Sequence, residues 1–333
     1  MRFENLSIVV PVYNAEKHIN NILINLAKIP DVAVIMVDDG SNDDTVFKIE
    51  QFISNNRLLK WRLIKPGHRG ASGARNVGIS EVKTKYVMFV DADDEIDIDA
   101  FLNLENLLYK DFDFLSIGQV HVNEFTDNLS DEYRKTLIFS MLGLKSFEKL
   151  DSINTKLSCP GPVSKVYSVD MLNEHSIHFP EEVVHGEDLL FNAAVVSKAK
   201  SIMFSSESIY LYYNNVESVS KAIRYDVVKN HFNFMDILLS ICECNELISQ
   251  KDKSAIKLIC EINDNTALIL QNSKATMIPF YTSDANFRLV KRRKIIHLLL
   301  LKCGMKSIIK KIVLNNRNAH YETSNSLREV QRY

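Results

Sequence analysis

Acidic residues follow directly after an apolar run in the stretch Tyr-Val-Met-Phe-Val-Asp-Ala-Asp-Asp at residues 86–94. Asp91, Asp93 and Asp94 lie within four residues of one another, and carboxylates this close repel unless a cation or hydrogen-bond donors compensate. Hard divalent cations prefer oxygen ligands. The cluster therefore predicts a site for Mg²⁺ or Mn²⁺. The competing interpretation is a solvated acidic turn ahead of a helix that begins near Ile98.

The apolar run at residues 86–90 positions this cluster. Its Val and aromatic side chains are typical of a central strand that is buried on both faces. In an open α/β sheet, ligands bind in the crevice beyond the carboxyl ends of such strands. We therefore expect Asp91 and Asp93 at the mouth of a binding site.

The residues before the cluster alternate between apolar runs and segments of helical periodicity, which predicts a parallel sheet with right-handed crossovers. The expected strands are residues 6–14, 32–37 and 59–65. The expected helices are residues 16–29, a segment ending near Asn55 with Ser41 or Asn42 as its N-cap, and residues 72–80. Tyr13-Asn14, Asp38-Asp39 and a Gly/Arg loop at 66–70 then share one sheet edge with the acidic cluster.

The remainder of the chain is less regular. We expect a helix at 100–109, a strand at 112–119 that continues the sheet, and a loop at 179–188 that leads into a helix at 189–197. Residues 122–150 give no clear pattern, and from residue 225 onward the periodicity is helical, including residues 256–270 and 291–314. The predicted division is therefore an α/β domain at 1–220 and a helical region at 221–333.

Composition limits the class of protein. The 333 residues are 46% hydrophobic, and no apolar run reaches the roughly 18 residues that span a bilayer. The N-terminus leads straight into a predicted strand rather than a signal peptide, so a cytoplasmic protein is expected. The five cysteines are scattered and odd in number, which favours reduced thiols.

Five segments, in order, resemble the family 2 glycosyltransferases with the GT-A fold. They are SIVVPVYNAEKHI, VDDGSNDDT, SGARNVGI, YVMFVDADD and GEDLLFN, and the resemblance covers roughly residues 6–220. Each alone is a weak signal, but together their order and spacing are specific. The resemblance implies an α/β, Rossmann-like and mostly parallel sheet flanked by helices, with a C-terminal helical extension. It also makes residues 1–220 the catalytic domain.

The resemblance implies a pocket for a nucleotide-sugar donor. In such enzymes the first two loops hold the base and ribose, so Pro11, Tyr13 and Asn14 are expected to line the pocket. Asp39 is expected to accept a hydrogen bond from the uracil imide, and Asp38 to support its loop. A turn with a helix cap is the alternative interpretation of the two aspartates.

The Asp-x-Asp motif of the family matches Asp91-Ala92-Asp93. By resemblance Asp93 is the direct ligand of Mn²⁺ or Mg²⁺, Asp91 is shared between metal and ribose, and Ala92 lies beside the donor. The ion would neutralise charge on the leaving nucleoside diphosphate. A guanidinium would pair with the diphosphate oxygens, and both Arg75 and Arg69 are candidates.

Members of this family invert the anomeric centre, which requires a carboxylate that takes the proton of the acceptor hydroxyl. Asp188 matches this base, with Glu187 as the next candidate and His185 as a neighbour that would help to bind phosphate or acceptor. The helix N-terminus at this position should favour the ionised form of Asp188. Without the resemblance, Glu187 and Asp188 would be ordinary first-turn residues.

The segment from residue 285 to 321 contains ten Lys or Arg and no acid, which leaves 30 basic and 42 acidic residues, a balance of −12, for the rest of the chain. Cations mixed with Leu and Ile at helical spacing are typical of interfacial helices. Residues 288–317 are therefore expected to meet an anionic membrane surface at the inner face of the cell membrane. Few aromatic residues accompany the charges, which disfavours nucleic acid. A solvated structural face is the alternative.

The prediction is thus a cytoplasmic, bacterial glycosyltransferase of the hexosyl or N-acetylhexosaminyl type. It would move one sugar per encounter from a UDP-sugar to a hydroxyl of a growing capsule, O-antigen or lipooligosaccharide. The acceptor would be a free glycan or a lipid-linked glycan. The Gln-x-x-Arg-Trp motif of processive synthases is absent, since Trp61 lies in a predicted strand. The rivals are a sugar-phosphate nucleotidyltransferase, which would carry a Gly-rich basic first loop, and a non-catalytic partner of other transferases. The oligomeric state is left open.

Overall fold

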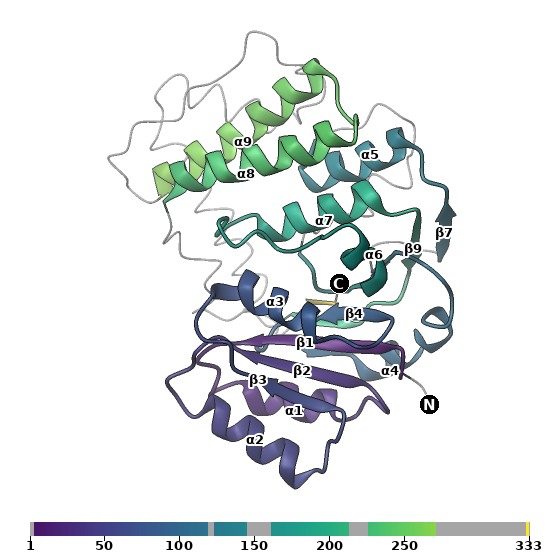
Figure 1. The fold of residues 1–333 in the computed structure, drawn as a ribbon, viewed down its shortest axis with the longest axis vertical. Helices are drawn as coiled ribbons and strands as arrows, with labels where there is room; N and C mark the ends of the chain where they lie inside the picture. The colour runs from purple at the N-terminus through teal and green to yellow at the C-terminus, as the bar shows by residue number, and fades with distance from the viewer. Residues whose placement is uncertain (1–2, 119–122, 145–160, 213–225, 271–330, 333) are drawn as a thin grey trace.

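A sheet with helices on both faces forms the centre of the protein (Figure 1). The structure is a computed structural model, and it describes residues 3–118, 123–144, 161–212, 226–270 and 331–332. The basic tail at 288–317 and the helix expected at 291–314 lie outside the described residues.

Within the described residues the central sheet has the strand order β3-β2-β1-β4-β8-β6-β9-β7. The strands are β1 (Leu6–Val12), β2 (Ala33–Asp38), β3 (Trp61–Ile64), β4 (Tyr86–Phe89), β6 (Phe114–Ile117), β7 (Glu124–Asp127), β8 (Lys165–Ser168) and β9 (Ser201–Ser205). The first four are parallel, as predicted. β6 continues the sheet, but β8 lies between it and β4 and is antiparallel to both. The predicted fold class, a mostly parallel α/β sheet, is confirmed.

Strand β1 shows why the sheet is central. Six of its seven residues are buried, and alternate side chains point to opposite faces. Ile8 and Val10 pack into one hydrophobic cluster, and Val9 packs into the other. A continuous apolar run is therefore what a strand covered on both faces requires.

The helices divide between the two faces. They are α1 (Ile19–Leu26), α2 (Thr45–Asn55), α3 (Gly70–Glu81), α4 (Ile98–Leu102), α5 (Asp131–Met141), α6 (Val169–Glu174), α7 (Glu187–Lys198), α8 (Val227–Cys244) and α9 (Gln250–Leu270). Helices α1, α2 and α4 contribute to the core on the face of Ile8. Helices α3, α5 and α7 contribute to the core on the face of Val9, and α8 and α9 form a further layer beyond α7 (Figure 1).

Helix α3 packs unusually close to the sheet at Gly78. A Cβ atom on Gly78 would lie 2.3 Å from Cγ1 of Val9 in β1, which is far inside van der Waals contact. Any larger residue would have to push α3 away from the strand. The missing side chain therefore sets the distance between α3 and the sheet.

The C-terminal helices share a core with the α/β part of the chain. Phe234, Met235 and Leu238 of α8 belong to the same hydrophobic cluster as Leu190 of α7 and Val9 of β1. The domain boundary between residues 220 and 221 falls outside the described residues and stays a prediction. The shared core makes α8 and α9 part of the structure that supports α7.

Several local expectations were wrong. The helix expected at 100–109 is α4 followed by a 3-10 turn at Glu105–Leu107. Ser41 and Asn42 do not cap α2, because Asp44 occupies the N-cap position and the other two bond to Asn14. The segment 122–150, left without an assignment, contains β7 and α5.

A second, small sheet brings a distant residue to the acidic cluster. It consists of β5 (Glu95–Ile96), β10 (Tyr210–Tyr212) and β11 (Gln331–Arg332), with β10 antiparallel to β5. In this register Tyr210 pairs with Ile96, directly after the acidic turn. The small sheet therefore fixes the segment that follows β4.

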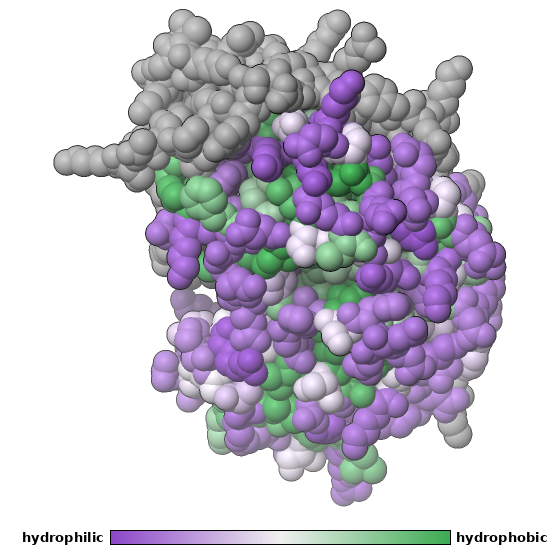
Figure 2. All heavy atoms as spheres, turned by 45° about the horizontal axis from the view of Figure 1, so that its top comes forward, coloured by the Kyte–Doolittle hydropathy of each residue, from purple (hydrophilic) through white to green (hydrophobic). Residues whose placement is uncertain are grey.

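Hydrophilic residues cover most of the described surface on the face drawn in Figure 2, with hydrophobic residues in small groups between them. Within the described part of the chain, no helix combines the length and the apolar character needed to cross a membrane.

Candidate active site

Arg75 of α3 lies between carboxylates from two other segments. Its Nη2 is 3.1 Å from Oδ1 of Asp91, which follows β4. Its Nη1 is 3.3 Å from Oδ1 of Asp188 and 3.9 Å from Oε1 of Glu187, both at the start of α7. Arg75 is 6% exposed. The fold therefore joins three of the predicted segments into one ion-pair network around a buried guanidinium.

Burial, together with the excess of negative charge in the network, raises the pKa of the two acids at the start of α7. Burial, together with Glu187 and Asp91, raises the pKa of Asp188 to about 7, although Arg75 acts in the opposite direction. Burial also raises the pKa of Glu187. Burial lowers the pKa of the Arg75 guanidinium, but the three carboxylates raise it by more. The pKa is therefore raised overall, and the guanidinium stays protonated.

The expectation that the helix N-terminus keeps Asp188 readily ionised was therefore incomplete. Asp188 and Glu187 do occupy the first turn of α7, after Gly186 as the N-cap. Partial burial beside two other carboxylates outweighs the effect of the helix dipole. Asp188 changes its charge near neutral pH, which is the range in which a general base works best.

The three aspartates after β4 have different surroundings. The side chain of Asp91 is 37% exposed, and Asp93 is exposed. Asp94 is 3% exposed, and its Oδ2 accepts a hydrogen bond of 2.8 Å from the hydroxyl of Tyr210. The same hydroxyl accepts from the backbone N–H of Asp91 at 3.2 Å. Asp94 therefore shapes the turn, and Asp91 and Asp93 are the carboxylates near solvent.

No group of three or more His, Cys, Asp and Glu side chains among the described residues is placed to hold a metal ion by itself. Asp91 and Asp93 nevertheless supply the oxygen donors that Mg²⁺ or Mn²⁺ prefers. Mg²⁺ commonly takes only one or two protein carboxylates and completes its shell with water and substrate phosphates. The residues present fit a cation that is held jointly by the chain and a diphosphate.

The first two loops are tied to each other by hydrogen bonds. The backbone N–H of Asn14 donates to Oγ of Ser41 at 2.8 Å, and Oδ1 of Asn14 accepts from the backbone N–H of Asn42 at 2.8 Å. The Asp38 carboxylate accepts from the backbone N–H groups of Gly40 and Ser41. Asn14 and Asp38 thus give these loops their shape.

Asp39 receives hydrogen bonds from the third loop. Its Oδ1 accepts from the backbone N–H of Arg69 at 2.6 Å, and its Oδ2 accepts from the backbone N–H of Gly70 at 3.0 Å. Nδ1 of His68 lies 2.9 Å from the same Oδ2. The ring of His68 lies 5.3 Å from that of Tyr13, which is half exposed. The Asp39 carboxylate therefore contacts the exposed ring of His68, and Tyr13 lies beside that ring. The backbone N–H of Asp39 donates to the carbonyl oxygen of Val12 at the end of β1, and Pro11 pairs with Val37.

The two arginine candidates have different surroundings. Arg69 is half exposed and binds the Glu181 carboxylate through Nη2, at 2.8 and 3.1 Å. Arg75 is buried, and its Nε has no hydrogen-bond partner among the described residues. A buried donor without an acceptor is costly, and an anionic ligand oxygen would satisfy it. The geometry favours Arg75 as the residue that belongs to the site, with Ala92 next to its partner Asp91.

Two residues near the network were not identified from the sequence. Lys165 of β8 is fully buried, donates from Nζ to the carbonyl oxygen of Gly161 at 2.5 Å, and lowers the pKa of Asp188 through its charge. Tyr210 is the second. Lys165 could have been noticed in the sequence, because it is a charged residue within the apolar alternation of β8. Nothing local could have placed Tyr210 beside residues 116 positions away.

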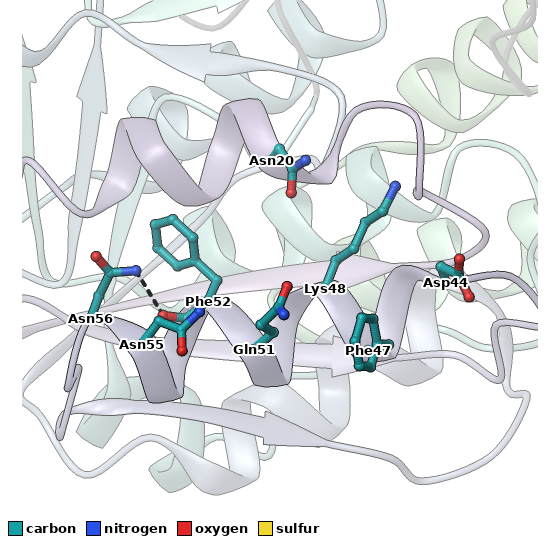
Figure 3. Close-up of a pocket in the computed structure, with 8 residues that line it drawn as sticks. All are labelled: Asn20, Asp44, Phe47, Lys48, Gln51, Phe52, Asn55 and Asn56. Carbon is teal, nitrogen blue, oxygen red and sulfur yellow. Dashed lines mark hydrogen bonds between the residues drawn. The ribbon is translucent and has the colours of Figure 1, made fainter.

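A shallow groove of about 280 Å³ runs along α2 on the outer face of the protein (Figure 3). It is lined by Asn20, Asp44, Phe47, Lys48, Gln51, Phe52, Asn55 and Asn56. None of these residues is among the predicted site residues.

The fold and this network define an α/β protein with a carboxylate-rich site at the carboxyl ends of its parallel strands. The sequence matches the family model named Glycosyl transferase family 2 over residues 7–176. The chain belongs to this family.

Curated relatives and solved structures agree with this assignment. The poly(ribitol-phosphate) beta-N-acetylglucosaminyltransferase TarS of Staphylococcus aureus is 27% identical over 236 residues, which is 70% of this chain and 39% of TarS. A poly(ribitol-phosphate) beta-glucosyltransferase of Bacillus spizizenii is 26% identical over 73% of this chain and 37% of its own length. The match thus spans about two fifths of these relatives.

The structure of S. aureus TarS residues 1–349 in complex with UDP-GlcNAc has the same fold. Its TM-score is 0.55 at 24% identity, and the match covers 79% of this chain and 72% of that one. The predicted GT-A fold is therefore confirmed.

Proposed function

We propose that this protein is an inverting glycosyltransferase that moves one sugar from a UDP-sugar to a hydroxyl of a cell-surface polymer. The observation that carries the proposal is the contact of Arg75 with both Asp91 and Asp188. By its place in the family motifs, Asp91 belongs to the donor side of the site and Asp188 to the acceptor side. One buried cation thus links the two halves that a transfer reaction needs.

The donor base would bind between the first and second loops. Uracil presents an imide N–H, and the Asp39 carboxylate can accept a further hydrogen bond, because each of its oxygens has two lone pairs. The ring of His68, which contacts this carboxylate, and the ring of Tyr13 beside it offer a stacking surface. The expected order of preference is therefore uridine nucleotides before cytidine nucleotides, since cytosine lacks the imide.

The diphosphate would bind at the acidic turn together with Mg²⁺ or Mn²⁺. Asp93 and Asp91 would hold the cation, which when bound neutralises charge on the leaving nucleoside diphosphate. Arg75 would orient the same group, since its buried Nε has no hydrogen-bond partner in the part of the chain that the structure describes. A second positive charge at this position is also electrostatically favourable, because three carboxylates face a single guanidinium here.

Asp188 would take the proton of the acceptor hydroxyl. Its pKa of about 7 means that about half of the side chains are ionised at neutral pH and most at pH 8. A base poised in this range combines availability with proton affinity. Glu187 is the alternative base, and its pKa is also raised by burial. His185, exposed on the preceding loop, would face the acceptor or the donor phosphates.

The relatives suggest which compounds to test. Their names specify N-acetylglucosaminyl or glucosyl transfer to poly(ribitol-phosphate). UDP-GlcNAc and UDP-glucose are therefore the first donors to examine. The acceptors should include poly(ribitol-phosphate) as well as free and lipid-linked glycans, because a hydroxyl of a surface polymer is common to both. Attraction of residues 288–317 to the inner membrane surface would bring the enzyme to such acceptors.

The test is a donor panel scored for release of the nucleoside diphosphate. The full chain would be incubated with UDP-GlcNAc, UDP-glucose and GDP-mannose, with Mn²⁺, Mg²⁺ or a chelator, and with each acceptor. We expect UDP release that depends on the divalent cation and increases with the correct acceptor. Release of pyrophosphate from a nucleoside triphosphate and a sugar phosphate would instead identify a nucleotidyltransferase. No turnover of any donor, despite binding, would identify a non-catalytic partner.

A further inference from the structure

The loop at residues 179–186 leads into α7 and its acid pair, and α3 holds its first half. Nδ2 of Asn76 donates to the carbonyl oxygen of Phe179 at 2.9 Å, and Oδ1 of Asn76 accepts from the backbone N–H of Phe179 at 2.8 Å. The pair of Arg69 and Glu181 adds a second link. The second half of the loop has a different support, which comes from the C-terminal helices.

Asn230 of α8 binds the loop through its entire carboxamide. Its Oδ1 accepts from the backbone N–H groups of Val184 at 2.8 Å and His185 at 3.1 Å, and its Nδ2 donates to the carbonyl oxygen of His185 at 2.9 Å. Asn230 is 6% exposed. This buried amide makes three backbone hydrogen bonds with the loop, which in a sheet would be made by the backbone of a neighbouring strand.

Two neighbours on α8 extend this contact. Nδ2 of Asn233 donates to the carbonyl oxygen of Glu182 at 2.9 Å, from the position three residues after Asn230, which lies on the same face of a helix. Gly186 has a φ of +95°, and a Cβ atom there would lie 2.7 Å from the ring of Phe234. Residues 182–186 are therefore pressed onto α8 without room for a side chain at the last position.

From this contact we infer that Asn230 is a positioning residue for the acid pair Glu187 and Asp188. Gly186 is the N-cap of α7, and its carbonyl oxygen accepts from the backbone N–H of Leu190 at 3.1 Å. A displacement of the loop must therefore move the first turn of α7. The inference rests on the proposed function, in which Asp188 takes the acceptor proton, and it assigns part of the active-site support to a helix beyond the family match at 7–176.

Loss of the carboxamide should affect turnover more than donor binding. Asn230→Ala removes the acceptor of two loop N–H groups and the donor to one loop carbonyl, which loosens the second half of the loop. A misplacement of about 1 Å in a catalytic group can cost about 10²-fold in rate. The loops at Asp39 and Asp91, which would bind the nucleotide, do not contact Asn230 in the described hydrogen bonds.

The experiment compares Asn230→Ala and Asn230→Asp with a matched control on the same helix pair. Asn230→Asp keeps an acceptor for both backbone N–H groups, but it replaces the donor to the His185 carbonyl oxygen with a carboxylate oxygen, which that carbonyl repels. The control is Asn245→Ala, because Oδ1 of Asn245 accepts from Nζ of Lys198 at 2.7 Å and so joins α8 to the far end of α7. For each full-length protein one measures kcat and KM for UDP release with Mn²⁺ and the UDP-sugar and acceptor that give the most release in the donor panel, UDP binding by calorimetry, the Tm, and hydrogen exchange of residues 182–188.

We expect kcat to fall 10- to 100-fold in Asn230→Ala and to fall also in Asn230→Asp, whose carboxylate faces the His185 carbonyl oxygen, with UDP affinity within twofold of the original chain. Exchange at 182–188 should rise in Asn230→Ala and stay unchanged in Asn245→Ala, whose kcat should also stay unchanged. Equal losses of kcat in Asn230→Ala and Asn245→Ala, or an unaltered kcat in Asn230→Asp and Asn230→Ala, would refute the positioning role. An original chain that releases no UDP would refute the proposed function instead, and the exchange measurement would then still decide whether Asn230 holds the loop.

Discussion

Arg75 and Asp188 lie 113 positions apart in the sequence, yet Nη1 of the arginine is 3.3 Å from Oδ1 of the aspartate. The same guanidinium contacts Asp91 after β4. This relationship means that any change on the donor side of Arg75 is felt electrostatically by the acid at the start of α7. The pKa of Asp188 is the quantity that reports it.

The first prediction concerns Arg75 itself. Arg75→Met removes the guanidinium that contacts both Asp91 and Asp188, so the pKa of Asp188 should rise further. The pH at which turnover reaches half its maximum should move upward, and turnover at pH 7 should fall by at least about 10²-fold, as expected for an electrostatic residue. Arg69→Met is the matched control, because its guanidinium pairs with Glu181 instead. An unshifted pH profile in Arg75→Met would separate Arg75 from Asp188.

The second prediction concerns the acid–base role of Asp188. In the original chain the rate should increase with pH through about 7, because the base must be ionised. Asp188→Asn should keep UDP affinity and lose at least about 10²-fold in kcat, and the remaining rate should lack this pH limb. If the limb persists and kcat is normal, the base is a different residue, and Glu187→Gln is the variant to measure next.

The third prediction concerns the stability cost of the same residue. The folded-state pKa of Asp188 is raised above its usual value of 3.8, so ionisation is less favourable in the folded than in the unfolded chain. Asp188→Asn should therefore raise the Tm at pH 8, where the charge is present in both states. The gain should shrink as the pH falls through 7 and vanish near 4, where both states are protonated. A Tm gain that is the same at pH 4.5 and pH 8 would contradict the shifted pKa.

The fourth prediction separates the three aspartates after β4. Asp91→Ala and Asp93→Ala should abolish Mn²⁺-dependent turnover and weaken Mn²⁺-dependent UDP binding, with little change in Tm for exposed Asp93. Asp94→Ala should mainly lower the Tm, because it leaves the buried hydroxyl of Tyr210 without its acceptor. Tyr210→Phe is the partner control for this stability effect. Full metal-dependent activity in the Asp91/Asp93 double variant would rule out the metal assignment.

The fifth prediction concerns the basic tail, which lies outside the described residues. Ten cations without an acid between residues 285 and 321 should bind anionic vesicles, at about 1 kcal/mol for each residue near the surface. Sedimentation with anionic and neutral vesicles at low and high salt would measure this for the full chain and for a variant with Lys291, Arg292, Arg293 and Lys294 replaced by Gln. Equal binding to neutral vesicles, or no loss in the variant, would assign the tail to another partner.

The sequence predicted the parts of the fold that depend on local patterns. The β1–β4 strands and α1–α3 follow from apolar runs that alternate with helical periodicity, and the acidic turn was placed correctly at a strand end. β7 and α5 were missed, because the exposed side chains of β7 and the polar residues of α5 give little period for a pattern to detect. The place of β8 between β4 and β6 was missed because strand order is set by packing at long range.

The site divides in the same way. Residue types and spacing named Asp91, Arg75 and Asp188, but only the fold shows that one guanidinium contacts all of these segments. Arg69 looked equivalent to Arg75, since the sequence contains no sign of its pairing with Glu181 112 positions later. The pKa of Asp188 was misjudged for a related reason, because the helix dipole is local and can be inferred from sequence, whereas burial beside other carboxylates cannot.

Gly78 fixes the position of the ion-pair network around Arg75 relative to the central sheet. Its absent side chain lets α3 lie against Val9, and Arg75 is carried one turn earlier on the same rigid helix. The distance between α3 and β1 therefore determines the position of the guanidinium relative to the strand ends. A random-mutagenesis screen for lost activity in folded protein should thus recover substitutions at position 78, although this position has no side chain with which to touch a ligand. The activity of this protein therefore depends on the distance between α3 and β1 as well as on the side chains of the site.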